Sequence, residues 1–281
     1  MRILLVCSFL LASVFAAPQT STEFRSLYGS PDRERFVVSP NINLTAEYGS
    51  DGRAYHAVIE TPMEPGGSPL ASSDQLARVL DEVVPPNTRG ASGPAQVTHS
   101  GCKGTESTSY ENVAIIWITY CDPDGGLDVQ DVDVTFKGPS RPTSTELHAR
   151  YGQPESERFQ ARPGMALTVD YGSDGLACGM LITSRENPSF EMDNLKLPFD
   201  SAGLDPGRAY LEMVHEILNE ALPESTRGKA GAAMTTQGSC GLIASAEYGN
   251  VSISSAGDAC VWGGVRGHVA FKRAVCLLPR K

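Results

Sequence analysis

The chain has 281 residues, of which 33 are acidic and 23 are basic, and its formal net charge is -10 at pH 7. A surface of this sign repels a phosphate backbone, and no basic cluster interrupts the acidic residues. Nucleic acid is therefore not expected as a partner.

The N-terminal residues predict a cleavable signal peptide. Arg2 is followed by an apolar run from Ile3 to Phe15 and then by the small residue Ala16. This run is too short to cross a membrane, and the small residues favour cleavage after Ala16. No later segment is long and apolar enough to span a bilayer, so the mature chain is expected to lack a transmembrane segment and to be secreted or periplasmic.

The rest of the chain contains an internal repeat. Residues 20–60 align with residues 143–183 without a gap and share 20 identities in 41 positions. The later parts realign at an offset of 138, which indicates an insertion of 15 residues within 184–206 of the second copy. We therefore expect a signal peptide at 1–16, a first repeat unit at 17–138, a linker at 139–142 and a second unit at 143–281.

Each unit is expected to begin with a short helix and a hairpin. Ser21 or Thr22 caps the first helix and Gly29 ends it, and in the second copy Ser144 or Thr145 is the expected cap and Gly152 the end. The shared string Tyr-Gly-Ser-Asp-Gly then predicts a tight turn between two strands, because its glycines accept positive φ angles. In the second copy, these strands are expected at 165–169 and 177–182.

A longer amphipathic helix and two further strands complete each predicted unit. The first copy offers a capping box from Ser72 to Gln75 and a stop at Pro85, and the second offers Asp205 before Pro206. Apolar residues recur at helical spacing in both segments. Extended runs follow at 113–119 and 132–136, and at 251–254 and 269–271. The predicted fold class is α+β, with two tandem homologous units, each α-β-β-α-β-β with its helices packed on an antiparallel sheet.

The cysteines predict disulfides. Cys7 leaves with the signal peptide, and six cysteines remain in a chain expected to be exported. The repeat favours pairing inside each unit, Cys102 with Cys121 and Cys240 with Cys260. The remaining two, Cys178 and Cys276, are then expected to pair with each other.

A search for catalytic motifs returns no nucleophile elbow, phosphate-binding loop, dinucleotide fingerprint or C-x-x-C pair. His215 and Glu216 resemble the start of a zinc-protease helix, but Asn219 stands where the second histidine is needed. An acidic stretch from Asp122 to Asp133 fits a calcium loop only in part, and a solvated turn is favoured over calcium. No catalytic residue, metal ion or cofactor is predicted.

The candidate partner-binding residues come from two places. Arg89 and Arg227 follow the long helix at matching positions, where they could bind an anionic group of a partner or cap the helix C-terminus. The insertion carries apolar residues that are expected to dock on a surface, among them Phe190, Met192 and Leu195. Asn43 and Asn250 lie in glycosylation sequons, and their modification stays open.

What the two copies share is caps, turns, prolines, core residues and cysteines, rather than a nucleophile and a base. The sequence therefore predicts an exported, non-catalytic tandem-repeat protein that acts as a binding or interaction module in the periplasm or extracellular space. Its partner would be a protein or a cell-surface component. The alternative is a secreted hydrolase whose site cannot be recognised from sequence.

Overall fold

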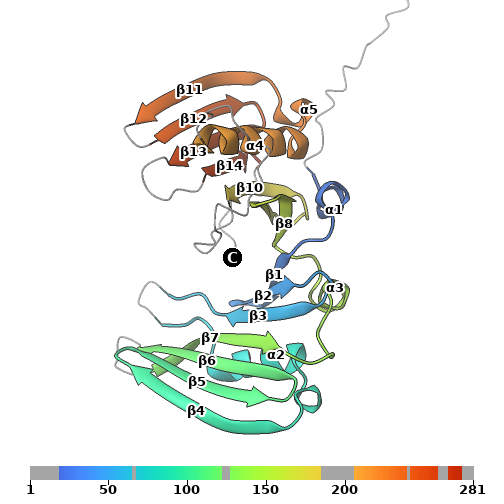
Figure 1. Ribbon diagram of the computed structural model, residues 1–281, viewed down its shortest axis with the longest axis vertical. Coiled ribbons are helices and arrows are strands. Elements are labelled where there is room, and N and C mark those ends of the chain that lie inside the picture. The colour runs from blue at the N-terminus through green and yellow to red at the C-terminus, as the bar shows by residue number, and fades with distance from the viewer. Residues whose placement is uncertain are drawn as a thin grey trace, which may run out of the picture.

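A computed structural model describes residues 19–64, 68–121, 127–184, 206–238, 241–258 and 265–273. In these ranges, fourteen strands form one antiparallel sheet with helices beside it (Figure 1). The strands of the first half are β1 (Arg33–Ser39), β2 (Ile42–Tyr48), β3 (Ala54–Glu60), β4 (Ser92–Ser100), β5 (Lys103–Tyr110), β6 (Val113–Cys121) and β7 (Leu127–Phe136). Those of the second half are β8 (Ser156–Arg162), β9 (Met165–Tyr171), β10 (Ala177–Ser184), β11 (Ala230–Gly238), β12 (Gly241–Tyr248), β13 (Val251–Asp258) and β14 (Val265–Phe271).

The helices repeat in the same order in both halves. They are α1 (Ser21–Tyr28), α2 (Ser73–Val83) and the 3-10 turn η1 (Pro86–Thr88), then α3 (Ser144–Tyr151), α4 (Pro206–Ala221) and α5 (Glu224–Arg227). No helix in the described ranges combines the length and the apolar character needed to cross a membrane.

The predicted fold class is wrong. The halves do not form two α-β-β-α-β-β units, because each half contributes seven strands and all of them belong to one sheet, in the order β11-β12-β13-β14-β10-β9-β8-β1-β2-β3-β7-β6-β5-β4. Strands β4 and β5 were missed because they are rich in serine, threonine and glycine and lack a buried apolar face; every residue of β4 is exposed. The central strands β1 and β8 were missed because they carry charged residues, one of which is buried in each strand.

The predicted caps of the first helices are wrong by one residue, because the capping boxes join Thr20 to Glu23 in α1 and Thr143 to Glu146 in α3. Two other local predictions are confirmed. Ser72 and Gln75 form the predicted box on α2. The predicted hairpin turn closes between β9 and β10, where Gly175 has a φ of 73°.

The two halves exchange their first helices. Phe24 of α1 is fully buried in the core of the second half, where its ring lies 6.2 Å from that of Phe159. Leu147 of α3, at the matching position, is buried in the core of the first half. In Figure 1, α1 accordingly lies beside β8, and α3 lies beside the first-half strands. Each hydrophobic core is therefore completed by a helix from the other half of the sequence.

The chain segments that lead into these helices are also held by the opposite half. Pro142 O, just before α3, accepts a hydrogen bond of 2.8 Å from Ala54 N at the start of β3. Gln19 O, just before α1, accepts one of 2.9 Å from Ala177 N at the start of β10. These matching contacts show that the repeat is also a structural pseudo-twofold, with its axis between β1 and β8.

Candidate functional site

The pseudo-twofold axis passes between two buried glutamates. Strands β1 and β8 pair over only three residues on each strand, and Glu34 stands directly opposite Glu157 at the centre of the pairing. Both side chains are 0% exposed. Two like charges opposite each other on a sheet repel, and burial strengthens that repulsion. The arrangement needs a cation between them.

Arg25 of α1 supplies that cation. Its Nη2 contacts Glu34 Oε1 and lies 2.6 Å from Glu157 Oε1, and its Nε donates a second hydrogen bond of 2.8 Å to the same Glu157 oxygen. Burial alone would lower the pKa of Arg25, but the two carboxylates raise it above its ordinary value. The guanidinium is therefore firmly charged where it joins the two halves.

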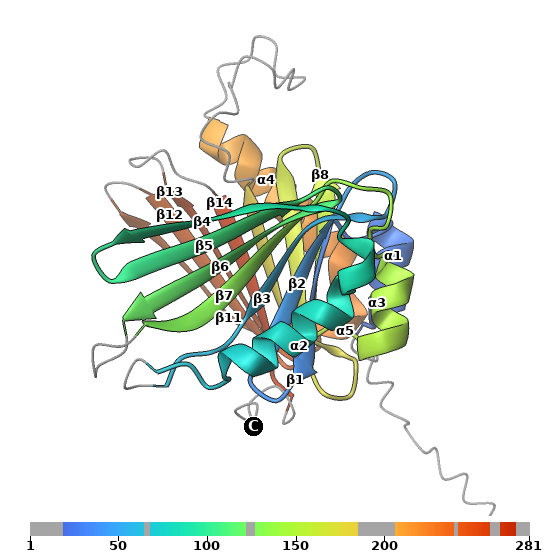
Figure 2. The same ribbon diagram turned by 90° about the horizontal axis from the view of Figure 1, so that it is seen from below.

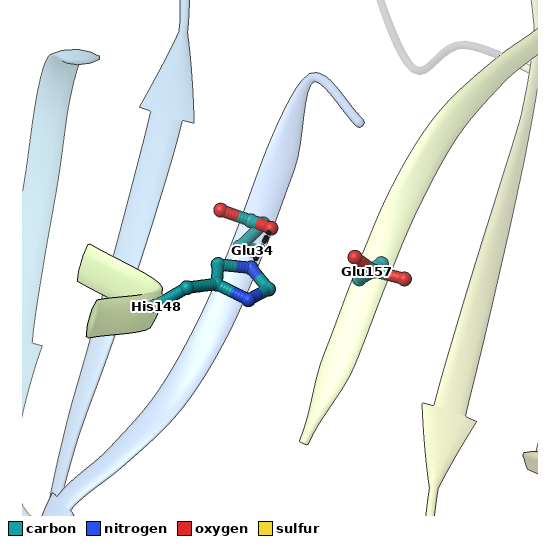
Figure 3. A group of neighbouring side chains, drawn as sticks. All are labelled: Glu34, His148 and Glu157. Atoms are coloured by element: carbon teal, nitrogen blue, oxygen red, sulfur yellow. Dashed lines mark hydrogen bonds and ion pairs between the residues drawn. The ribbon is translucent and has the colours of Figure 1, made fainter. Parts of the chain in front are cut away.

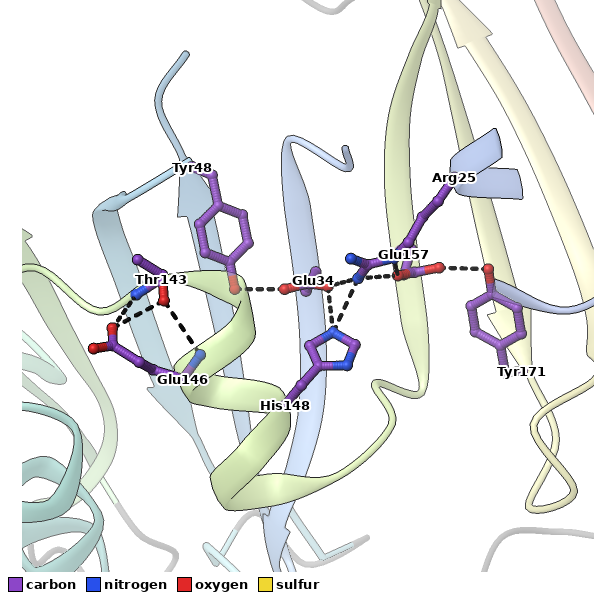
Figure 4. A network of polar contacts seen from close by, with 8 residues as sticks. All are labelled: Arg25, Glu34, Tyr48, Thr143, Glu146, His148, Glu157 and Tyr171. Atoms are coloured by element: carbon purple, nitrogen blue, oxygen red, sulfur yellow. Dashed lines mark hydrogen bonds and ion pairs between the residues drawn. The ribbon is translucent and has the colours of Figure 1, made fainter. Parts of the chain in front are cut away.

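Two tyrosines satisfy the remaining carboxylate oxygens (Figure 4). Tyr48 donates a hydrogen bond of 2.6 Å to Glu34 Oε2, and Tyr171 donates one of 2.6 Å to Glu157 Oε2. Burial would raise the pKa of Glu34, but hydrogen bonds from His148 and Tyr48 and the charge of Arg25 hold it below its usual value. Burial beside a carboxylate raises the pKa of both tyrosines, so each stays a hydrogen-bond donor.

His148 of α3 occupies the position that matches Arg25. Its Nε2 lies 2.7 Å from Glu34 Oε1 and 2.9 Å from Arg25 Nη2. Glu34, His148 and Glu157 each bring one potential metal-ligating atom within 4.8 Å of the others (Figure 3). However, Arg25 Nη2 already contacts those atoms of all three residues, so a metal ion could enter only if Arg25 moved away. We assign this central cluster, Arg25, Glu34, His148 and Glu157, a structural role.

Two matching ion pairs flank the central cluster. Arg158 donates to both oxygens of Asp32, at 2.8 and 3.1 Å, and Arg35 Nε lies 3.4 Å from Glu155 Oε1. These pairs are related by the repeat, as in the self-complementary interface of a symmetric dimer. The centre of the molecule therefore has the chemistry of an interface between two copies, joined here in one chain.

Sequence reasoning did not predict the central cluster. The string Glu-Arg-Phe, shared at Glu34 and Glu157, was a signal, because an acid shared by two strands suggests burial with a partner. The aligned pair Arg25 and His148 was a second signal. Neither signal indicated which residues would pair with each other, because Arg25 and Glu157 are 132 residues apart in the chain.

A second polar cluster lies on the other face of the sheet. His56 on β3 lies between Glu47 and Asp133, with Nε2 at 3.0 Å from Asp133 Oδ2 and Nδ1 at 3.6 Å from Glu47 Oε2. Hydrogen bonds to Asp133 and Glu47 raise the pKa of His56 to about 9. The same contact with His56 helps to hold the pKa of Glu47 below its ordinary range.

The charge on His56 should stabilise the fold in a defined pH window. Because the folded pKa lies above the unfolded value of about 6.5, the contribution is complete below about pH 6.5 and is lost as the pH rises through about 9. His56→Gln should therefore lower the free energy of unfolding at about pH 6.5, and its difference from wild type should shrink towards pH 10. Urea unfolding at several pH values measures this, with the exposed His215→Gln as control. A difference that does not change with pH would contradict the role of the charge.

A groove lies between the N-terminal end of α2 and the helix-facing side of β4–β7. Its volume is about 440 Å³. Trp117 and Val129 line it as partly buried apolar residues, and Val97, 58% exposed, stands on the edge strand β4. Asp74 and Glu106 add two exposed carboxylates. We call this site, defined by Asp74, Val97, Glu106, Trp117 and Val129, the α2 groove. Figure 2 shows that β4–β7 project past the helices in this region.

The second half does not repeat the chemistry of the α2 groove. Glu106 stands opposite Trp117 in the pairing of β5 with β6. The matching pair in β12 and β13 is Ala244 with Ser255, and Thr235 on β11 matches Val97. The fold is therefore repeated, while Glu106 and Trp117 have no acidic or aromatic counterpart in the second half.

The two predicted arginines lie at helix C-termini. Arg89 Nε donates 3.0 Å to Val84 O, and Arg227 Nε donates 2.9 Å to Leu222 O. Each guanidinium also lies 5.9 Å from a tyrosine ring. These contacts match the capping role that the sequence offered as the alternative to partner binding. Binding by these arginines stays a prediction.

The other predicted site residues are only partly placed. Phe190, Met192 and Leu195 of the insertion lie outside the described residues, as do Cys240, Cys260, Cys276 and the start of the acidic stretch. Its later members Asp131 and Asp133 lie on strand β7.

The cysteine pairings also stay predictions. Cys102 lies in the turn between β4 and β5 and Cys121 is the last residue of β6, and Cys121 N donates a hydrogen bond of 3.0 Å to Cys102 O. Cys178 lies on β10, and its predicted partner Cys276 is outside the described ranges.

Two sequence motifs are placed by the structure. His215 and Glu216 are exposed on α4. Of the sequon asparagines, Asn43 is buried on β2, and Asn250 donates 2.9 Å to Thr226 O.

The geometry thus offers a central cluster whose polar atoms hold the halves together and a groove at which Asp74, Val97 and Glu106 are exposed. No protein-family model, curated protein or solved structure matches the chain significantly.

Proposed function

We propose that this chain is an exported, non-catalytic binding protein and that its partner, a protein or cell-surface component, docks in the α2 groove. Export is supported by the predicted signal peptide at 1–16. The observation that carries the binding role is the difference between the halves at the groove: Glu106 and Trp117 in the first half, Ala244 and Ser255 in the second.

The two copies of the repeat need to keep some residues in common and can differ at others. Residues that build the fold are needed twice, and Thr20, Glu34 and Tyr48 are indeed matched by Thr143, Glu157 and Tyr171. A binding site for one partner is needed only once. Trp117 and Glu106 follow the second pattern, and tryptophan is frequent among residues that anchor partners.

The central cluster supports the non-catalytic part of the proposal. The hydrogen-bond partners of its two carboxylates are Arg25, His148, Tyr48 and Tyr171. A carboxylate that accepts from a tyrosine and pairs with a guanidinium is stabilised as an anion, which opposes proton transfer. The polar contacts of the cluster therefore hold the two halves together.

Site-specific photo-crosslinking tests the proposal. A photoreactive amino acid at Val97, at the edge of the α2 groove, should give a discrete adduct in cells that produce the full chain. The adduct should be recovered outside the cytoplasm. The matched probe at Thr235, exposed at the same position of β11, should give none, and Trp117→Ser should abolish the adduct at Val97. Equal adducts at both positions, or none at either, would overturn docking at this groove.

The competing hypothesis is a secreted hydrolase. Incubation of the full chain with generic ester, peptide and glycoside substrates distinguishes the two, since a binding protein should turn over none of them. Turnover that scales with protein concentration and co-purifies with the chain would refute the non-catalytic part of the proposal.

A further inference from the structure

The side chains of the α2 groove restrict the chemistry of its occupant. We propose that the groove binds a segment of a partner protein that presents a large apolar side chain flanked by lysine or arginine. This inference rests on the proposed binding function and adds the chemical class of the partner.

Trp117 supplies apolar surface to the α2 groove. Its side chain is only partly buried although it packs against the first hydrophobic core, so one part of the indole faces the groove. Val97 and Val129 border the same space, and Val97 is 58% exposed. An aromatic or long aliphatic side chain placed here would remove this apolar surface from water. A volume of about 440 Å³ accommodates one such side chain together with part of a neighbouring residue.

Asp74 and Glu106 supply negative charge to the α2 groove. Both carboxylates line the groove, and neither side chain makes a hydrogen bond or an ion pair within the part of the chain that the structure describes. By contrast, other acids near the first helices and the sheet centre are paired, among them Asp32, Glu34 and Glu47. Two unpaired carboxylates beside an apolar surface favour a cation, and the indole face of Trp117 favours one as well.

The net charge of the chain agrees with a basic partner. At -10, the field of the whole protein attracts a positively charged segment and speeds its encounter with the groove. An acidic segment would be repelled by the same field and would leave Asp74 and Glu106 uncompensated.

Short peptides test the partner chemistry directly on the full chain. The probes are fluorescein-labelled Gly-Lys-Phe-Lys-Gly, its acidic counterpart Gly-Glu-Phe-Glu-Gly, and Gly-Lys-Ala-Lys-Gly, which lacks the apolar anchor. Fluorescence anisotropy gives each affinity. Trp117 emission in a Trp262→Phe background reports contact with the groove, because the chain has only these two tryptophans.

The basic aromatic peptide should bind at least about tenfold more tightly than either control peptide, equivalent to about 1.4 kcal/mol. Its binding should shift Trp117 emission and weaken with added salt, because exposed charges are screened. The double variant Asp74→Asn, Glu106→Gln should weaken binding about tenfold. The matched control Glu216→Gln, Glu224→Gln makes the same change in net charge on the exposed surface of the second half, and it should leave binding unchanged. All four positions are exposed, so these variants should fold normally.

Each other outcome overturns the inference. If the three peptides bind equally, or if the two double variants weaken binding equally, the groove does not select a basic apolar segment. If the chain dimerises and Trp117→Ser abolishes the dimer, the occupant is a second copy. Crosslinking at Val97 that persists while the basic peptide fails to bind would leave the proposed binding function standing and reject only this partner chemistry.

Discussion

Replacing Arg25 with alanine should lower the free energy of unfolding by about 3 kcal/mol or more. The substitution would leave the carboxylates of Glu34 and Glu157 facing each other in the interior without the guanidinium of Arg25 that contacts both. Breaking a buried ion pair from one side costs more than the pair contributes, because the remaining charge is left without compensation. Chemical denaturation measures the change.

The control is Arg162→Ala. Arg162 pairs with Glu220 where both side chains are substantially exposed, and such a pair contributes less than about 1 kcal/mol. Adding Glu157→Gln to the Arg25→Ala variant should recover part of the lost stability, because it removes one of the two facing charges. Equal costs for the Arg25 and Arg162 variants would show that the central cluster does not hold the halves together.

Phe24→Ala and Leu147→Ala should each destabilise the half of the molecule that lies opposite in sequence. Phe24 is fully buried in the second core and Leu147 in the first, so truncation should cost about 3–5 and about 2–5 kcal/mol respectively. Hydrogen exchange localises the effect. Phe24→Ala should reduce amide protection first in β8–β10, and Leu147→Ala should reduce it first in β1–β3.

The two variants are matched controls for each other, because the residues occupy the same position of the repeat. If Phe24→Ala instead loosened β1–β3 and left β8–β10 protected, the helices would not be exchanged. That result would also remove Arg25 from between the two glutamates, since Arg25 is carried on α1 next to Phe24.

The exchange gives the repeat a physical role. A helix that packs only on its own half would leave the two halves joined by the three-residue pairing of β1 with β8. With the helices exchanged, each half is completed by a buried side chain of the other, and separation would expose both cores. The long single sheet therefore depends on the helices as much as on its central hydrogen bonds.

The α2 groove illustrates how a repeated fold acquires one specific surface. The β5–β6 and β12–β13 pairs have matching registers, so their backbones present side chains in the same geometry. The side chains differ, since Glu106 and the partly buried Trp117 of the first half are matched by Ala244 and the buried Ser255 of the second. The proposed function depends on that difference.

The sequence by itself determined the features that depend on neighbouring residues. The capping box from Ser72 to Gln75, the turn at Gly175 and the apolar stripe of α2 follow from interactions within a few positions, where propensity and periodicity apply. The repeat also indicated two halves of like structure. These features depend on residues close together in the chain or on the similarity of its two halves, so they can be recognised without the folded structure.

Only the tertiary structure decided how the halves combine. The joining of all strands in one sheet, the exchange of α1 and α3, and the meeting of Arg25 with Glu157 all involve residues far apart in the chain. Polar strands such as β4 have no buried face to produce an alternating pattern, so periodicity could not find them. The α2 groove also could not be predicted from the sequence. Asp74 and Trp117 are far apart in the chain and line the same groove only after α2 has packed on strands from a later part of the sequence.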